Sequence, residues 1–128
     1  MKKIIHTEKA PKAVGPYSQA VEANGFLFIS GQIPMDPATG KIVAGGIREQ
    51  TDQVMKNIGS ILAETGCTYT DVVKSTCLLS DMENFAAMNE VYAKYYPEDP
   101  PARAAYGVVK LPLGVLVEIE TIAVMREE

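Results

Sequence analysis

Residues 47–65 read IREQTDQVMKNIGSILAET, and this stretch has the clearest periodicity in the chain. Its apolar residues recur at offsets of 0, 7, 8, 11, 14 and 15, which is the spacing of one face of an α-helix. They are Ile47, Val54, Met55, Ile58, Ile61 and Leu62. Polar side chains cover the opposite side, and Gly66 is suited to end a helix. The stretch predicts an amphipathic helix whose apolar face packs on another layer.

The flanking segments predict that this layer is a β-sheet. Strand-like runs occur at residues 3–6, 17–22, 26–30, 72–79, 102–110 and 115–125. The run Ser80-Asp81-Met82-Glu83 resembles a capping box that opens a second helix at about residues 82–96, which Pro97 ends. Residues 31–46, rich in glycine and proline, are expected to be mostly loop.

The order of elements is therefore β-β-β-α-β-α-β-β, within one α+β domain over residues 1–128. We expect two helices on one face of the sheet, with the last two strands paired across Leu-Pro-Leu-Gly at residues 111–114. In the run Phe26-Leu27-Phe28-Ile29 every residue is apolar, which indicates a strand covered on both faces. Because the second face also needs a cover, the sequence predicts a homo-oligomer.

Composition and charge argue against several classes of function. The 128 residues carry a net charge of -4, with lysine and arginine scattered along the chain, which disfavours nucleic acid as a partner. No window approaches the ~20 apolar residues of a membrane helix, and the N-terminus lacks the apolar run of a signal peptide. Cys67 and Cys77 lack the spacing of a disulfide framework or a zinc site, which favours reduced thiols in a cytoplasmic protein. With a single histidine, His6, no metal site is expected.

Arg103 is a lone charge within the apolar run PPARAAYGVV at residues 100–109. Small alanines flank it, which leaves room around the guanidinium. Two parallel N–H donors suit a carboxylate, which an arginine binds bidentately. The alternative is an arginine of an edge strand that forms a salt bridge or extends into solvent.

Glu118 and Glu120 lie two residues apart in the last predicted strand, so both carboxylates share one face about 7 Å apart. They belong either to a solvated face with paired lysines or to a site where a carboxylate activates water. If the last two strands pair, Arg103 and Glu118 lie roughly 13 Å apart. That span is long for one small ligand, so either the register is longer or a neighbouring chain completes the site.

Three further positions are candidates for a ligand cleft. Tyr17 follows the rigid turn Gly15-Pro16, and Ser30-Gly31 closes an apolar strand where a ligand can approach the backbone. Asn89 lies near the apolar stripe of the second helix, where its amide needs partners. Each also has an ordinary structural explanation. His6 is expected at the surface, so no Ser-His or Cys-His pair supports nucleophilic hydrolysis.

Four motifs occur in order along the chain. They are Ala10-Pro11 with Gly15-Pro16-Tyr17-Ser18-Gln19, Ser30-Gly31-Gln32-Ile33-Pro34, Pro101-Ala102-Arg103, and Val117-Glu118-Ile119-Glu120. Together they resemble the Rid (reactive intermediate deaminase) family, RidA type, also called the YjgF family, over essentially the whole chain. The resemblance implies a chorismate-mutase-like fold, a homotrimer with the sheets packed inward, and three clefts between subunits.

The resemblance also implies an activity, the hydrolysis of enamines and imines such as 2-aminoacrylate/2-iminopropanoate and 2-iminobutanoate to 2-keto acids and ammonia. Arg103 then binds the substrate carboxylate and Glu118 positions or activates the attacking water, with no metal or organic cofactor required. The implied substrate-binding residues are Tyr17, Ser30, Gly31, Asn89, Arg103, Ala104, Ala105 and Glu118. Many bacterial relatives carry a cysteine where this chain has Ala105, so a thiol at that position is excluded here.

Two alternatives remain beside the deaminase. Some relatives are described as endoribonucleases or translation inhibitors, although the acidic composition and the lack of a basic patch or a catalytic histidine disfavour RNA cleavage here. The chain is otherwise a non-catalytic trimeric module that binds small carboxylates through the same arginine.

Overall fold

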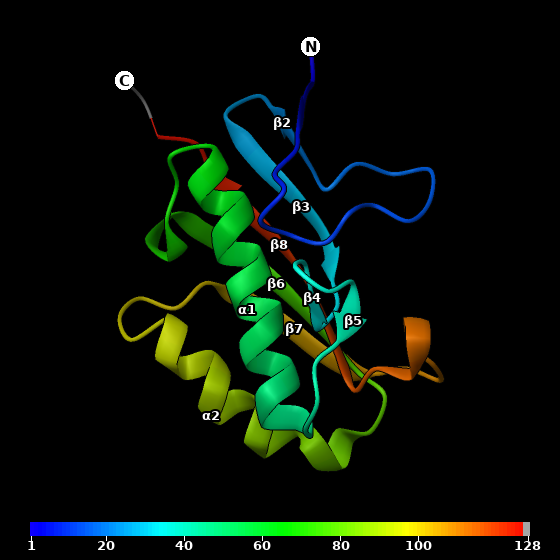
Figure 1. The fold of residues 1–128 in the computed structure, drawn as a ribbon. Helices are drawn as coiled ribbons and strands as arrows, with labels where there is room; N and C mark the ends of the chain where they lie inside the picture. Colours follow the sequence, from blue (N-terminus) through cyan, green and yellow to red (C-terminus); the bar gives the residue numbers. More distant parts are fainter. Residues whose placement is uncertain (127–128) are drawn as a thin grey trace.

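The computed structural model describes residues 1–126, which form a six-stranded sheet with both long helices on one face (Figure 1). The strand order is β1-β2-β3-β8-β6-β7. The helices are α1 (Ile47–Glu64) and α2 (Phe85–Tyr95). The strands are β1 (Lys3–Ile5), β2 (Ala20–Ala23), β3 (Phe26–Gln32), β6 (Val72–Leu79), β7 (Ala102–Gly107) and β8 (Val117–Val124). The α+β class and the placement of two helices on one face are confirmed.

The pairing of the last two strands differs from the prediction. β7 runs parallel to β6 at the edge of the sheet, and β8 lies between β3 and β6, antiparallel to both. The predicted hairpin is therefore wrong. A parallel neighbour requires a crossover, which α2 supplies between β6 and β7. The segment after β7, with a 3-10 turn at Pro112–Gly114, then carries the chain back so that β8 gains hydrogen-bonded neighbours on both sides.

Two local features also depart from the sequence prediction. The expected loop at residues 31–46 contains a small hairpin of β4 (Met35–Asp36) and β5 (Lys41–Ile42). The second helix opens with a 3-10 turn at Met82–Asn84 before α2 begins. Asp81, rather than Ser80, caps that turn, since its carboxylate accepts a hydrogen bond from the Glu83 N–H at 2.9 Å. Strand and helix bounds otherwise agree within a few residues.

The core lies between the sheet and the helices. Alternate residues of the central strands β3, β6 and β8 point toward α1 and α2 and are fully buried. Each buried aliphatic side chain of this kind contributes roughly 1.5–3 kcal/mol of transfer free energy. The largest buried side chains are Leu27, Met55, Ile58, Ile61, Leu62, Leu79, Met88 and Ile119.

None of the helices within residues 1–126 is long and apolar enough to cross a membrane.

The opposite face of the sheet, here called the open face, carries no helix in the part of the chain that the structure describes (Figure 1). It combines apolar side chains of β3 and β8 with the polar Lys74, Thr76 and Glu120. Phe26 and Phe28 of β3 remain 41% and 43% exposed there, and Val124 of β8 is 41% exposed. Strand alternation directs these side chains away from the core. An exposed apolar patch of this kind is typical of an interaction surface.

Candidate active site

A cavity of about 410 Å³ lies beside the ends of β3 and β8 and gathers four of the predicted residues. Tyr17, Ser30, Gly31 and Glu118 all line it, and we call these four the glutamate half-site. Apolar side chains form the remaining wall, together with Glu120. The other lining residues are Val14, Ile33, Pro112 and Glu120.

Gly31 allows the side chain of Glu118 to lie directly against the backbone of β3. A Cβ atom built on Gly31 would overlap Oε2 of Glu118. The pairing of β3 with β8 shifts register between Ile29 and Gln32, so a bulge places Gly31 at this point. The missing side chain was expected to let a ligand approach the backbone. In the structure, the group that occupies the space is a carboxylate of the same chain.

Glu118 is a half-buried carboxyl without an ion-pair partner among residues 1–126. Burial raises the pKa of Glu118, and the nearby charge of Glu120 raises it further. Because both effects disfavour the ionised form, Glu118 is a better proton acceptor once ionised than an exposed glutamate. A carboxylate in this state, lining a cavity, is suited to hold a water molecule and to remove its proton.

Local hydrogen bonds fix the other two members of the glutamate half-site. The N–H of Tyr17 donates to the carbonyl of Gly15 at 2.8 Å, and the N–H of Val14 donates to the Tyr17 hydroxyl at 3.3 Å. The phenol is thereby directed to the cavity while remaining half exposed. The Ser30 hydroxyl donates to the carbonyl of Ser18 at 2.6 Å. Ser30 therefore ties β3 to the segment that carries Tyr17.

Arg103 lies at the other edge of the sheet, on β7, beneath α2. Its Nη1 donates to Oδ1 of Asn89 at 2.7 Å. Its Cζ lies 5.0 Å from the ring centroid of Tyr92 and 5.5 Å from that of Phe85, within the range of cation–π attraction. The predicted need of Asn89 for a partner is met by this arginine. We call Arg103 and Asn89 the arginine half-site.

Ala104 and Ala105 follow the arginine along the edge strand. Ala104 pairs with Thr76 of β6, and Ala105 pairs with Cys77. β7 is the last strand of the sheet, so its outer backbone groups have no neighbouring strand within residues 1–126. Small side chains on an unpaired edge leave backbone donors and acceptors accessible beside Arg103.

One chain holds the two half-sites on opposite faces of the sheet. Arg103 pairs with Ser75, whose side chain is buried under the helices, whereas Glu118 pairs with Leu78 between two core residues and points to the open face. Three residues along the strands and two strands across separate them, about 14 Å by ideal sheet spacing. The longer register considered in the sequence analysis is not found. A ligand held by both groups requires a second copy of the chain.

The cysteines offer no reactive thiol near either half-site. Cys67 and Cys77 are both buried and free. Burial raises the pKa of the Cys77 thiol to about 11, and the charge of Arg103 offsets only part of this effect. A thiol with such a pKa is protonated at neutral pH and is a poor nucleophile. Within residues 1–126, no group of three His, Cys, Asp or Glu side chains is arranged to hold a metal ion.

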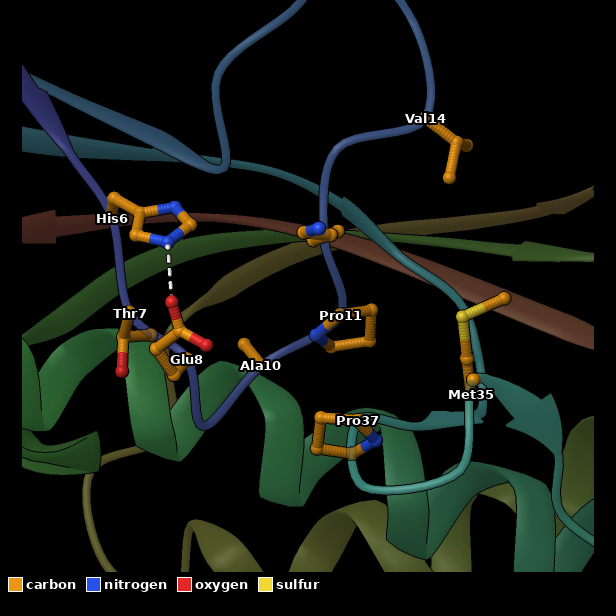
Figure 2. Close-up of a pocket in the computed structure, with 10 residues that line it drawn as sticks. His6, Thr7, Glu8, Ala10, Pro11, Val14, Met35 and Pro37 are labelled. Carbon is orange, nitrogen blue, oxygen red and sulfur yellow. Dashed lines mark ion pairs between the residues drawn. The ribbon is translucent and has the colours of Figure 1, made fainter.

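A second hollow, of about 430 Å³, lies between the N-terminal segment and the β4–β5 hairpin (Figure 2). His6 Nε2 faces Glu8 Oε1 at 3.7 Å on its rim, and Pro11, Pro37 and Met35 form its apolar side. The hollow contains none of the predicted site residues. His6 is exposed, as predicted, and the chemistry-bearing residues lie elsewhere.

Phe85 and Tyr92 are residues beside Arg103 that the sequence did not single out, because they belong to the apolar stripe of the second helix. They flank Asn89 at spacings of four and three residues, which places all three on one face of α2. This helical spacing around Asn89 is visible in the sequence, but nothing in the pattern specifies a cation beside the three residues. The apolar cavity wall of Val14, Ile33 and Pro112 gave no comparable signal, because distant segments form it.

Comparison with known proteins agrees with this architecture. The family model described as Endoribonuclease L-PSP matches residues 7–125. A RutC family protein of Pyrococcus horikoshii is 58% identical over 123 residues, covering 96% of this chain and 98% of that protein. The bovine protein named 2-iminobutanoate/2-iminopropanoate deaminase is 53% identical over 124 residues, covering 97% of this chain and 90% of that protein.

Solved structures give the same result. The crystal structure of Escherichia coli TdcF with bound serine superposes with a TM-score of 0.92 at 38% identity, covering 97% of this chain and 99% of that one. The mixed sheet with two helices on one face is thus the fold of these proteins. The chain belongs to the Endoribonuclease L-PSP family, which includes the Rid and RutC proteins, and the family predicted from the sequence is confirmed.

Proposed function

We propose that this protein hydrolyses enamine and imine intermediates, 2-aminoacrylate/2-iminopropanoate and 2-iminobutanoate, to the corresponding 2-keto acids and ammonia. The site that does so combines the glutamate half-site of one subunit with the arginine half-site of its neighbour in a homotrimer. The observation that carries the proposal is the placement of Arg103 and Glu118 on opposite faces of the sheet. The names of the bovine and other mammalian relatives support the reaction.

In this mechanism Arg103 binds the substrate carboxylate through two parallel N–H donors and places the imine carbon against the neighbour's Glu118. Glu118 removes a proton from water as the water oxygen adds to that carbon and passes it to the imine nitrogen, giving a neutral carbinolamine. Glu118 then takes the proton of the new hydroxyl and delivers a proton to the amino nitrogen, so that the C–N bond breaks, the carbonyl forms and neutral ammonia leaves. One water is consumed for each ammonia released. No covalent enzyme intermediate is needed, because an imine carbon is already electrophilic.

The ionisation of Glu118 suits both proton transfers. Burial raises its pKa toward the working pH, so the carboxyl can act first as a base and then as an acid. The serine bound by TdcF is a small molecule with a carboxylate and an amino group, which are the groups of the proposed substrates. The apolar residues of the glutamate half-site cavity then face the short aliphatic side chain.

The homotrimer is supported by the open face. Phe26, Phe28 and Val124 expose contiguous apolar surface there, and a copy of the same chain is the simplest cover for it. A cyclic arrangement repeats one contact around an axis, so each subunit contributes one half-site to each of two clefts. The buried free cysteines fit a reducing compartment such as the cytoplasm.

The family model's description favours one other activity, RNA cleavage. The net charge of -4 and the absence of histidine from both half-sites argue against it. A non-catalytic module for small carboxylates uses the same arginine, so turnover separates it from the deaminase. A purified preparation is expected to leave RNA intact.

The test is ammonia release from freshly generated substrate. Threonine dehydratase supplies 2-iminobutanoate, semicarbazide traps what is not hydrolysed, and the protein is expected to compete with the trap. Arg103→Ala should lose at least about a hundredfold in kcat/KM, since it removes a charged substrate contact worth a few kcal/mol. The matched control is Arg48→Ala, which removes a surface arginine paired with Glu90 and should keep full activity. Full activity of Arg103→Ala would contradict the site.

A further inference from the structure

We infer that one face of α2, formed by Phe85, Asn89 and Tyr92, positions the guanidinium of Arg103 and leaves its charge free for a carboxylate. Phe85 and Tyr92 are thus positioning residues that act through Arg103. The inference rests on the proposed role of Arg103 as the carboxylate anchor. The contacts of α2 explain why Arg103, at an exposed strand edge, is held in one orientation.

We call Phe85, Asn89 and Tyr92 the cradle, and helical spacing brings these three residues together. Phe85, Asn89 and Tyr92 recur after four and three residues, so their side chains project from one side of α2 toward β7. The two rings lie 5.5 Å and 5.0 Å from the Cζ of Arg103, and the amide oxygen lies 2.7 Å from Nη1. A cation near two ring faces gains about 0.5–2 kcal/mol, according to how far it is desolvated. The three contacts together restrict the rotation of the guanidinium.

The N–H groups of Arg103 that do not bind Asn89 show which side of the guanidinium is available to a ligand. A guanidinium has five N–H donors, and Asn89 accepts from Nη1 only. Within residues 1–126 no other acceptor is hydrogen-bonded to Arg103. Nε and Nη2 thus keep donors for a ligand, and these two nitrogens form the edge that binds a carboxylate bidentately.

Because Asn89 is uncharged, it leaves the positive charge of Arg103 unneutralised. Arg126 and Arg48 are each paired with a carboxylate, Asp71 and Glu90 respectively. Arg103 forms no such ion pair among residues 1–126, and its hydrogen-bond partner is an uncharged amide. An amide orients the guanidinium without neutralising it, whereas an aspartate at this position would compete with the substrate carboxylate.

The cradle is itself held in place by other tyrosines. The ring of Tyr92 packs on that of Tyr96 at 4.8 Å, and Tyr96 meets the edge of Tyr69 at 6.0 Å. The Tyr69 hydroxyl donates to the carbonyl of Met55 on α1 at 2.6 Å. This connection fixes Tyr92 relative to both helices, so the orientation of Arg103 is coupled to the packing of α1 against α2.

Two measurements on the intact oligomer test the inference. Rotation about the Cζ–Nε bond of Arg103 is followed by 15N NMR of the guanidinium, and binding of 2-oxobutanoate, the expected product, is followed by calorimetry. Asn89→Ala and Tyr92→Leu should both accelerate the rotation and weaken binding about tenfold, the equivalent of about 1.4 kcal/mol. Circular dichroism checks that each variant is folded.

Asn89→Asp separates orientation from charge. The introduced carboxylate should pair with Arg103, so rotation stays slow while 2-oxobutanoate binds at least about tenfold more weakly. The matched control is Glu90→Gln on the next residue of α2, which should change neither measurement. A role in helix packing alone predicts no such separation.

Unchanged rotation in both Asn89→Ala and Tyr92→Leu would overturn the inference, as would undiminished binding in Asn89→Asp. Accelerated rotation together with 2-oxobutanoate binding that does not depend on Arg103 would instead contradict the proposed function. The cradle would then orient an arginine that binds something else. The two failures are therefore distinguishable.

Discussion

At the scale of single residues, the site depends on the close approach of Glu118 to Gly31. Only a residue without a Cβ leaves room for the carboxylate at the bulge of β3. The same carboxyl is half-buried beside Glu120, which raises its pKa. The position and the ionisation of this one side chain are thus both set by its immediate neighbours.

Gly31→Ala should displace the Glu118 carboxylate and leave the fold intact. The new Cβ overlaps the far end of a flexible side chain, which can move aside at little cost in stability. A displacement of about 1 Å at a reacting group lowers the rate by about a hundredfold, so kcat/KM in the imine assay should fall by that factor. The control is Gly46→Ala at the start of α1, where a Cβ makes only an ordinary van der Waals contact with Glu49 Oε1 at 3.9 Å and activity should persist. Undiminished activity of Gly31→Ala would contradict the placement of Glu118.

Glu118→Gln should abolish turnover and stabilise the folded protein at neutral pH. The pKa of Glu118 is higher in the folded than in the unfolded protein. The free energy of unfolding is therefore highest below the unfolded-state pKa, where the carboxyl is protonated in both states, and it falls as pH rises through the folded-state pKa. At neutral pH the ionised Glu118 therefore opposes folding, and glutamine removes that penalty. Thermal unfolding at several pH values checks the sign. A difference in Tm that vanishes at pH 7 and grows at pH 4 would contradict it.

At the scale of elements, the two helices are joined by a short hydrogen bond. The Tyr95 hydroxyl of α2 donates to Asp52 of α1 at 2.5 Å, and this bond is the main reason that the pKa of Asp52 is lowered. A lowered carboxyl pKa contributes stability above the unfolded pKa, and the contribution is lost as pH falls through the folded value. The contact of α1 with α2 should therefore weaken in acid.

Tyr95→Phe should destabilise the protein by about 1 kcal/mol at pH 7, the value of a hydrogen bond to a partly exposed charged group. The loss should shrink in acid, as the pH falls through the lowered pKa of Asp52 and the carboxylate becomes protonated. Urea unfolding at pH 7 and in acid measures the difference. Tyr106→Phe, whose hydroxyl has no partner among residues 1–126, serves as the control. An equal loss at both pH values would show that Asp52 is not the partner that matters.

Most elements could be predicted from the sequence, but the pairing of the strands could not. The periodicity of α1 and the run of β6 determined their bounds to within a residue. β8 lies between β3 and β6 because their edges are free after the chain has crossed over through α2. Local sequence patterns do not show which strand edges are free, so they could not predict this pairing. The apolar residues of β8 suit a central strand as well as a hairpin.

The site was predicted as a set of residues rather than as an arrangement. Tyr17, Ser30, Gly31 and Glu118 do converge on one cavity. Arg103 does not join them, because its face of the sheet follows from its pairing with Ser75. The wrong strand pairing therefore placed Arg103 and Glu118 on the same face of the sheet, although the expected separation of roughly 13 Å is close to the value of about 14 Å from ideal sheet spacing.

At the scale of the whole molecule, the open face and the divided site have the same explanation. Apolar side chains of β3 and β8 are left in water by the single chain, and each half-site lacks the group that the other supplies. The proposed assembly of three copies would cover the first and complete the second. The activity and the oligomer should then be lost together.

Phe28→Lys places a charge at the centre of the open face and should dissociate the trimer. Burial of an unpaired lysine costs several kcal/mol, which exceeds what one interface can absorb. Light scattering after size exclusion should give three chain masses for the wild type and one for the variant, with deaminase activity lost. Ala63→Lys, on the exposed side of α1, is the control and should remain trimeric. A trimeric, active Phe28→Lys protein would place the interface elsewhere.

The most direct test of the divided site is complementation between two inactive variants. Arg103→Ala and Glu118→Gln are co-expressed with different tags, and the mixed oligomers are isolated by two affinity steps. If each cleft takes Arg103 from one subunit and Glu118 from the next, every mixed trimer contains one intact cleft, and about a third of the wild-type kcat per trimer returns. Mixed trimers as inactive as their parents would contradict the account, because that result requires both residues to act within one chain.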